Sequence, residues 1–137
     1  MIPFCPLLLL GIVELIKRYK IELSGKKCLV IGRSQIVGLP IGILLGQNKS
    51  YANATVTVAH SRTKNLDLLC ASSNIIISAI GIPNFLKSSM VSDKTVIIDV
   101  GISRIEDSTS PRGYKIVGDV DIDDFRDRDI TVSYTHL

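Results

Sequence analysis

Short apolar runs, separated by segments of helical periodicity, constrain the fold of this chain more than any other feature. The four clearest runs are rich in valine and isoleucine and cover residues 28–31, 55–59, 74–79 and 95–100. Near-continuous apolar strands are typical of parallel sheets, because helices cover both faces of such a sheet. Strands that alternate with helices therefore predict an α/β fold, a Rossmann-like doubly wound and mainly parallel sheet in a single domain.

The helical segments have apolar residues at spacings of three and four. We expect helices over residues 7–19, 37–45 and 66–71, and a final helix that begins at residues 121–125 with Asp121 as its N-cap. Residues 115–117 form a possible fifth strand, and residues 107–113 a turn-rich loop.

Composition excludes several classes of protein. The 137 residues suffice for one domain, and a net charge of +3, with its basic residues scattered, does not favour binding to nucleic acid. The apolar run at residues 7–13 is too short to span a bilayer and soon meets Glu14, so we expect no membrane segment. Cys5, Cys28 and Cys70 are far apart, which indicates neither a disulfide framework nor a metal site and favours a reducing cytoplasm.

The segment from Gly32 to Gly38 predicts a site for a phosphate group. It joins the first strand to a helix, and the unpaired N–H groups of a helix's first turn favour an anion. Its pattern is G-x-S-x-x-x-G, with Ser34 at the second glycine position of the usual G-x-G-x-x-G fingerprint and one extra residue before Gly38. An ordinary glycine-containing turn remains the alternative.

The end of the second strand bears on the choice between NAD and NADP. NAD-binding folds usually place an acid there, but residues 60–64 contain none and the next acid is Asp67. Ser61, Arg62 and, across the crevice, Arg33 could bind a 2′-phosphate instead, which favours NADP; a solvated basic loop is the alternative. We interpret His60 as a structural or edge residue, because no base–nucleophile partnership is visible beside it.

The acidic residues give no catalytic pair. We expect a structural role for Asp99 at the end of a buried strand, because no second carboxylate is expected nearby for acid–base work. Four closely spaced acids lack the ligand pattern of a calcium loop, and we interpret them as the N-terminal face of a helix: Asp119, Asp121, Asp123 and Asp124.

Four segments, in order along the chain, closely resemble the bifunctional methylenetetrahydrofolate dehydrogenase/methenyltetrahydrofolate cyclohydrolase family. They are residues 32–40, 54–63, 96–102 and 117–121. The resemblance implies a cytoplasmic, usually homodimeric enzyme of one-carbon metabolism and purine biosynthesis. Such an enzyme oxidises 5,10-methylenetetrahydrofolate by hydride transfer to NADP and hydrolyses the methenyl product to 10-formyltetrahydrofolate.

The resemblance also implies which residues bind the cofactor. Gly32, Arg33, Ser34 and Ile36 match the family's cofactor loop, and Arg33 and Ser61 match its contacts to the 2′-phosphate. The segments that line the nicotinamide half are matched by Ala79, Gly81, Gly101 and Ile102.

The chain also departs from the family pattern. The family's folate site and its catalytic Tyr and Lys lie in an N-terminal domain that these 137 residues do not match, so we expect no catalytic residue here and an inactive isolated chain. We expect a linking helix at residues 1–23, an NAD(P)-binding domain at 24–131 and a non-native tail at 132–137, the end of a truncated gene product. Two alternatives remain: a non-catalytic dinucleotide-binding or dimerisation module, and a reductase of the shikimate dehydrogenase type, against which residues 118–121 argue.

Overall fold

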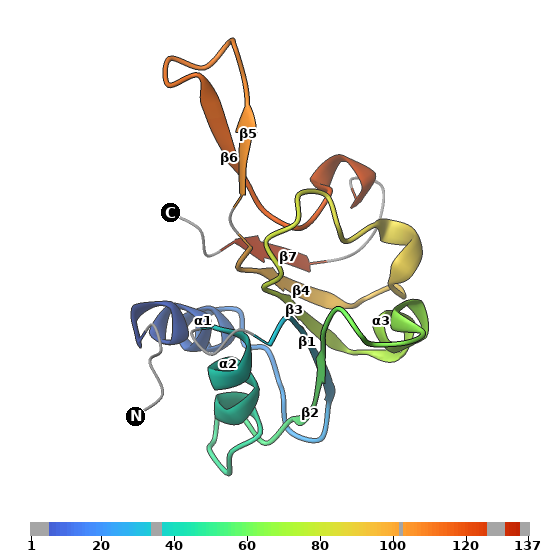
Figure 1. Ribbon diagram of the computed structural model, residues 1–137. Helices are drawn as coiled ribbons and strands as arrows, with labels where there is room; N and C mark the ends of the chain where they lie inside the picture. Colours follow the sequence, from blue (N-terminus) through green and yellow to red (C-terminus); the bar gives the residue numbers. More distant parts are fainter. Residues whose placement is uncertain (1–5, 34–36, 102, 126–130, 135–137) are drawn as a thin grey trace.

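Helices and strands alternate along the chain, as the apolar runs predict (Figure 1). The structure is a computed structural model that describes residues 6–33, 37–101, 103–125 and 131–134. Its helices are α1 (Pro6–Arg18), α2 (Gly38–Leu45) and α3 (Leu66–Ser72), with short 3-10 helices η1 (Ser88–Met90) and η2 (Ile122–Phe125). Its strands are β1 (Lys27–Ile31), β2 (Thr55–Ala59), β3 (Ile75–Ser78), β4 (Val96–Asp99), β5 (Ser103–Glu106), β6 (Tyr114–Val117) and β7 (Thr131–Tyr134).

Five strands form one parallel sheet in the order β2-β1-β3-β4-β7. In the centre, Val30 of β1 pairs with Val58 of β2 on one side and with Ile77 of β3 on the other. The chain leaves β1 toward β2 and then crosses back to β3 on the opposite side of β1. The strand order therefore reverses between β1 and β3, and ligands of open α/β sheets bind at the carboxyl ends of the strands at such a point.

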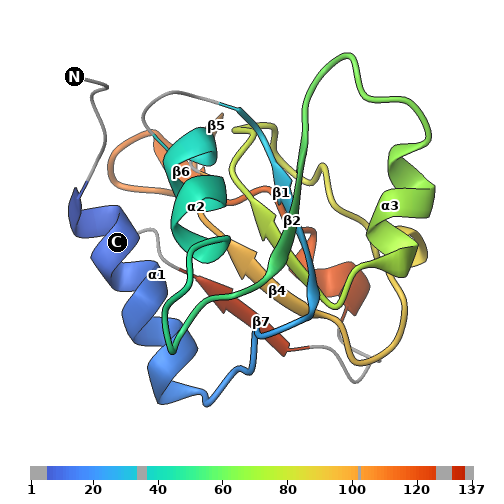
Figure 2. The ribbon, with the colours of Figure 1, turned by 90° about the horizontal axis from the view of Figure 1, so that it is seen from below.

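Alternate residues of the strands face two separate cores. Val30 and Ile77 point toward α1 and α2, whereas Leu29 and Ile76 point toward α3 and the two short 3-10 helices. Figure 2 shows α1 and α2 on one side of the sheet and α3 on the other. All four side chains are at most 1% exposed, and burial of each stabilises the fold by about 1.5–3 kcal/mol. The doubly wound α/β prediction is thus confirmed.

The expected fifth strand exists, but it does not join the parallel sheet. β6 pairs antiparallel with β5, and the two strands form a hairpin that projects from the body of the molecule (Figure 1). At its tip the Asp107 carboxylate accepts hydrogen bonds from the Thr109 N–H (3.0 Å) and hydroxyl (2.6 Å), which lower the pKa of Asp107. The sequence therefore located the strand and the turn but missed β5.

The last part of the chain contributes an edge strand. β7 pairs with β4 and places Thr131 opposite Val96 and Ser133 opposite Ile98. Residues 132–134 thus extend the sheet, while residues 135–137 lie outside the described part; that the tail is non-native stays a prediction. Where the expected final helix would begin there is the short η2, and residues 126–130, into which that helix would continue, lie outside the described part. None of the helices among the described residues is long and apolar enough to cross a membrane.

Candidate functional site

The carboxyl ends of β1 and β3 come into direct backbone contact at the point of strand-order reversal. The Gly32 N–H donates to the Ala59 carbonyl of β2 (2.8 Å), and the Ala79 N–H donates to the Ile31 carbonyl (2.8 Å). Gly32 has a φ of +117°. A Cβ at this position would lie 2.5 Å from the Ala79 carbonyl oxygen, so the position requires glycine.

The first turn of α2 is held against the same backbone. A Cβ on Gly38 would overlap the carbonyl group of Gly32, so Gly38 allows the helix to begin directly above the end of β1. Val37 occupies the N-cap and provides no side-chain hydrogen bond to the first amides of α2. Unpaired amides and the helix dipole favour an anion at this position, as the sequence predicts. Of the predicted loop residues, Ser34 and Ile36 lie outside the described part of the chain.

A tight turn follows β2. The Thr63 hydroxyl accepts the His60 N–H (2.8 Å), and the Thr63 N–H donates to the His60 carbonyl (3.0 Å). His60 Nδ1 accepts the Arg62 N–H (3.2 Å). His60 therefore acts through its backbone and ring as part of the turn, which confirms its structural interpretation.

Basic and hydroxyl side chains follow β1 and β2 at the carboxyl edge of the sheet. Ser61 and Arg62 are exposed on the turn after β2, and Arg33 is exposed after β1. Within the described ranges, neither arginine forms an ion pair; the ion pairs found there join Arg18 to Glu14 and Lys87 to Asp121. Both guanidinium groups thus remain available for an anion at the end of β2.

Asp119 is fully buried behind the loop that follows β3, and its position corrects a prediction. Its carboxylate accepts the Ser78 hydroxyl (2.8 Å) and three backbone N–H groups, those of Ile80 (2.8 Å), Gly81 (3.0 Å) and Ile82 (3.2 Å). Asp119 is therefore not on the face of a helix. The N–H donors of the loop replace water around the buried charge.

Asp99, at the end of β4, has the expected structural role. Its carboxylate accepts N–H groups from Gly101 (2.9 Å), Asp119 (3.1 Å) and Val120 (3.0 Å). Burial raises the pKa of Asp99, these donors oppose the rise, and the charge of Asp119 adds to it. The premise that no second carboxylate lies near was wrong, because folding brings Asp119 next to Asp99.

The predicted cofactor residues thus divide into three groups. Gly32, Arg33, Ser61 and Arg62 lie at the ends of β1 and β2, and Ala79 and Gly81 lie on the loop after β3. Gly101 is buried against Asp119, and Ile102 lies outside the described residues. Sequence reasoning missed the buried position of Asp119; the available signal was that Asp99 stands two residues before Gly101 and Asp119 stands directly after Gly118.

Comparisons with known proteins agree with this geometry. The family model described as "Tetrahydrofolate dehydrogenase/cyclohydrolase, NAD(P)-binding domain" matches residues 6–134. The chain is similar to Bifunctional protein FolD of Flavobacterium psychrophilum, at 51% identity over 90% of this chain and 42% of the relative. Its similarity to FolD of Bacteroides fragilis is 52% over 83% of this chain and 39% of the relative. The chain therefore spans about two fifths of the length of the curated relatives it matches.

Solved structures show the same architecture. The chain superposes on the bifunctional enzyme FolD of Campylobacter jejuni with a TM-score of 0.78 and 38% identity, over 93% of this chain and 41% of that one. It superposes on the Trypanosoma brucei dehydrogenase-cyclohydrolase, described as complexed with NADP cofactor and inhibitor, with a TM-score of 0.81 and 32% identity. That match covers 93% of this chain and 42% of the other. The chain therefore belongs to the tetrahydrofolate dehydrogenase/cyclohydrolase family and contains its NAD(P)-binding domain.

Proposed function

We propose that this chain binds NADP in the crevice between the ends of β1 and β3. The observation that carries the proposal is the set of cationic and hydroxyl side chains at the end of β2, where NAD-binding folds usually place an acid. Ser61 and Arg62 on that turn, together with Arg33 after β1, hold the 2′-phosphate. A carboxylate in their place would repel that group, so the site favours NADP over NAD.

The rest of the cofactor lies along the ends of the other strands. The pyrophosphate sits at the first turn of α2, next to Gly32 and Gly38. Ser34 and Ile36, which lie outside the described residues, remain predicted contacts of the cofactor. The nicotinamide half extends toward Ala79, Gly81, Gly101 and Ile102. The chain's own part in the chemistry is to bind and orient the ring that receives the hydride.

We further propose that the chain serves an enzyme that oxidises 5,10-methylenetetrahydrofolate and hydrolyses the methenyl product to 10-formyltetrahydrofolate. This extends to the chain the dehydrogenase and cyclohydrolase activities named in the descriptions of its family and of the solved structures it resembles. The chain spans about two fifths of its relatives. The groups that bind and activate folate belong to the part of those relatives that the chain does not match. A cytoplasmic homodimer that supplies one-carbon units for purine biosynthesis completes the proposal.

Calorimetric titration of the purified chain with NADP and, in parallel, with NAD tests the cofactor proposal. We expect NADP to bind more tightly, because NAD lacks the phosphate that the two arginines neutralise. Arg33→Ala should weaken NADP binding by about tenfold, the effect of losing one charge-assisted contact of about 1.5 kcal/mol. The same substitution should leave the affinity for NAD nearly unchanged.

Arg112→Ala is the matched control, because Arg112 is an exposed arginine on the β5–β6 hairpin. It removes the same net charge from the chain but should not change the affinity for NADP. Equal affinities for NADP and NAD in the wild-type chain would contradict the proposed role of the end of β2. A folded chain that binds neither nucleotide would contradict the proposed function as a whole.

A further inference from the structure

The loop after β3 is attached to a distant part of the chain through one buried carboxylate. The three consecutive N–H groups of Ile80, Gly81 and Ile82 and the hydroxyl of Ser78 all donate to Asp119. The backbone around Asp119 is held in turn, since the Leu86 N–H donates to the Asp119 carbonyl (2.9 Å). The loop thus takes its conformation from a residue about 40 positions away.

Asp99 holds the backbone of Asp119 from the other side. It accepts the N–H of Asp119 itself and that of Val120, which ties residues 119–120 to the end of β4. Each carboxylate also occupies the space beside a glycine: a Cβ on Gly101 would overlap the Asp119 carboxylate, and a Cβ on Gly118 would overlap that of Asp99. We call the four residues Asp99, Gly101, Gly118 and Asp119 the carboxylate clasp.

The carboxylate clasp lies behind the loop after β3, on the side of the crevice away from the proposed 2′-phosphate position. In a dinucleotide fold the adenosine ribose lies at the end of the second strand, so the other nucleotide extends past β1 toward β3 and β4. Gly81 is exposed on the loop that the clasp holds, with a φ of +76°, and apart from its chain neighbours no atom of the described residues lies within 4 Å of where its Cβ would be. A flat ring can therefore approach the backbone at Gly81.

We propose that Asp119 is a positioning residue for the nicotinamide half of the cofactor, and that Asp99 orients Asp119 for this role. The inference rests on the proposed NADP site. Asp119 touches no substrate; it acts through the backbone of residues 80–82, whose N–H groups it binds. An asparagine cannot replace it, because its single side-chain oxygen cannot serve four donors and its NH₂ group would face N–H groups.

Titration with two ligands separates positioning from general structural damage. NADP contains both halves of the dinucleotide, whereas adenosine 2′,5′-bisphosphate contains only the adenosine half with its 2′-phosphate. Asp119→Asn should weaken NADP binding by about tenfold, as expected for a loop that has lost about 1.5 kcal/mol of preorganisation. It should change the affinity for the bisphosphate by less than about twofold.

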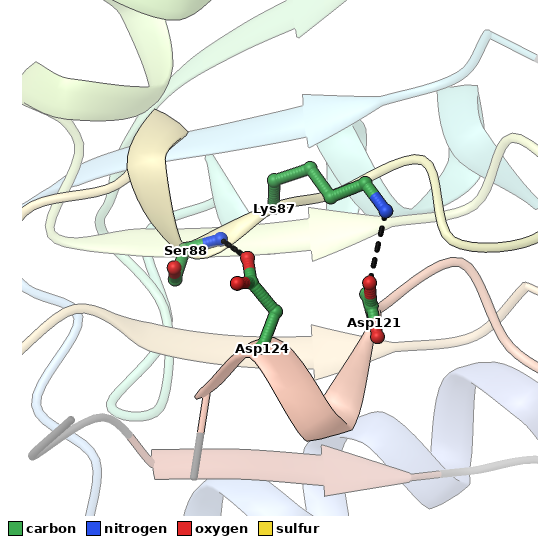
Figure 3. A network of polar contacts seen from close by, with 4 residues as sticks. All are labelled: Lys87, Ser88, Asp121 and Asp124. Carbon is green, nitrogen blue, oxygen red and sulfur yellow. Dashed lines mark hydrogen bonds and ion pairs between the residues drawn. The ribbon is translucent and has the colours of Figure 1, made fainter. Parts of the chain in front are cut away.

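The neighbouring Asp121 provides the control. Figure 3 shows its carboxylate paired with the Lys87 ammonium group (2.9 Å), next to the hydrogen bond from the Ser88 N–H to Asp124 (2.6 Å). Asp121→Asn makes the same chemical change two residues away and should leave both affinities unchanged. Ser78→Ala removes one of the four donors, keeps the carboxylate, and should give a smaller loss for NADP alone; it replaces Asp119→Asn if that variant does not fold.

Equal losses for NADP and the bisphosphate, or no loss for NADP, would overturn the inference. Amide hydrogen exchange of the unliganded chain tests it independently of the proposed function. The amides of Ile80, Gly81 and Ile82 should exchange faster in Asp119→Asn, or in Ser78→Ala, than in the wild-type chain and in Asp121→Asn. Unchanged exchange at these amides in the variants would contradict the clasp. If the amides exchange faster in the variants but the wild-type chain binds no NADP, only the proposed function is contradicted.

Discussion

Substitution of Gly32 by alanine tests the close approach of β1 and β3 most sharply. Two costs add in Gly32→Ala. A φ of +117° costs a residue with a side chain about 1–3 kcal/mol. The new Cβ would also lie 2.5 Å from the Ala79 carbonyl oxygen and 3.0 Å from its carbon, and overpacking of this kind adds about 1–3 kcal/mol. We therefore expect a loss of about 2–6 kcal/mol in the free energy of unfolding.

Two other glycines separate these costs. Gly25 has a φ of +72°, and apart from its chain neighbours no atom in the described part of the chain lies within 4 Å of its Cβ position. Gly25→Ala therefore carries only the backbone cost of about 1–2 kcal/mol. Gly11 lies inside α1, and outside that helix's own backbone no described atom lies within 4 Å of its Cβ position, so Gly11→Ala should stabilise the chain by about 0.5–1 kcal/mol. We therefore expect a fixed order of stability among the three variants.

Urea unfolding of the three variants and the wild-type chain, monitored by circular dichroism, measures this order. The unfolding midpoints can be compared directly when the dependence of the free energy on urea concentration is the same for all four chains. Gly11→Ala should be the most stable, followed by the wild type, Gly25→Ala and Gly32→Ala. A cost for Gly32→Ala no larger than that for Gly25→Ala would refute the inferred backbone contact, because the overlap with Ala79 would then contribute nothing.

Three further predictions concern individual side chains. Burial raises the pKa of Cys28 to about 12, and burial together with the charge of Asp67 raises the pKa of Cys70 to about 11. Iodoacetamide at about pH 8 should therefore label neither cysteine until the chain unfolds, as peptide mapping would show. Rapid labelling of the folded chain would contradict this prediction. Burial raises the pKa of Asp99 above its ordinary value of 3.8. The contribution of Asp99 to stability is therefore full below pH 3.8 and declines as pH rises through the folded pKa. Urea midpoints from about pH 4 to pH 7 should show this decline in the wild type and not in Asp99→Asn; parallel profiles would exclude it. Lys87→Ala should reduce the free energy of unfolding by at most about 1 kcal/mol, because the ion pair with Asp121 is partly exposed; a larger loss in urea unfolding would mean that the lysine also packs.

The regular elements were predictable because their signals are local. β2 has the predicted bounds and α2 begins one residue later than predicted, since runs of β-branched residues and helical spacing act over a few neighbours. β5 was missed because residues 103–106 contain a single apolar residue, and its pairing with β6 supplies the strand conformation. The intrinsic strand propensity of single residues predicts such a hairpin poorly, because pairing between strands decides their conformation.

The site was predictable where it follows from strand topology and not where it depends on distant contacts. Gly32 and the basic turn after β2 could be placed because the carboxyl ends of parallel strands share one edge of the sheet. Asp119 could not, because its donors lie about 40 residues earlier and no periodicity relates them. Its neighbours Asp121 and Asp123 made the segment resemble a helix face, and only the fold shows that Asp119 points inward.

The location of the bound cofactor is the central claim, and amide hydrogen exchange with and without saturating NADP tests it most directly. We predict slower exchange in the bound state at Gly32, at residues 60–63 and at residues 79–82, all at the carboxyl edge of the sheet. The opposite edge offers a rival site, a hollow of about 420 Å³ at the amino ends of β1, β3 and β4 whose lining includes Lys20, Lys26 and Lys94. Slower exchange around Lys26 and Lys94, with none at the carboxyl edge, would contradict the proposed site.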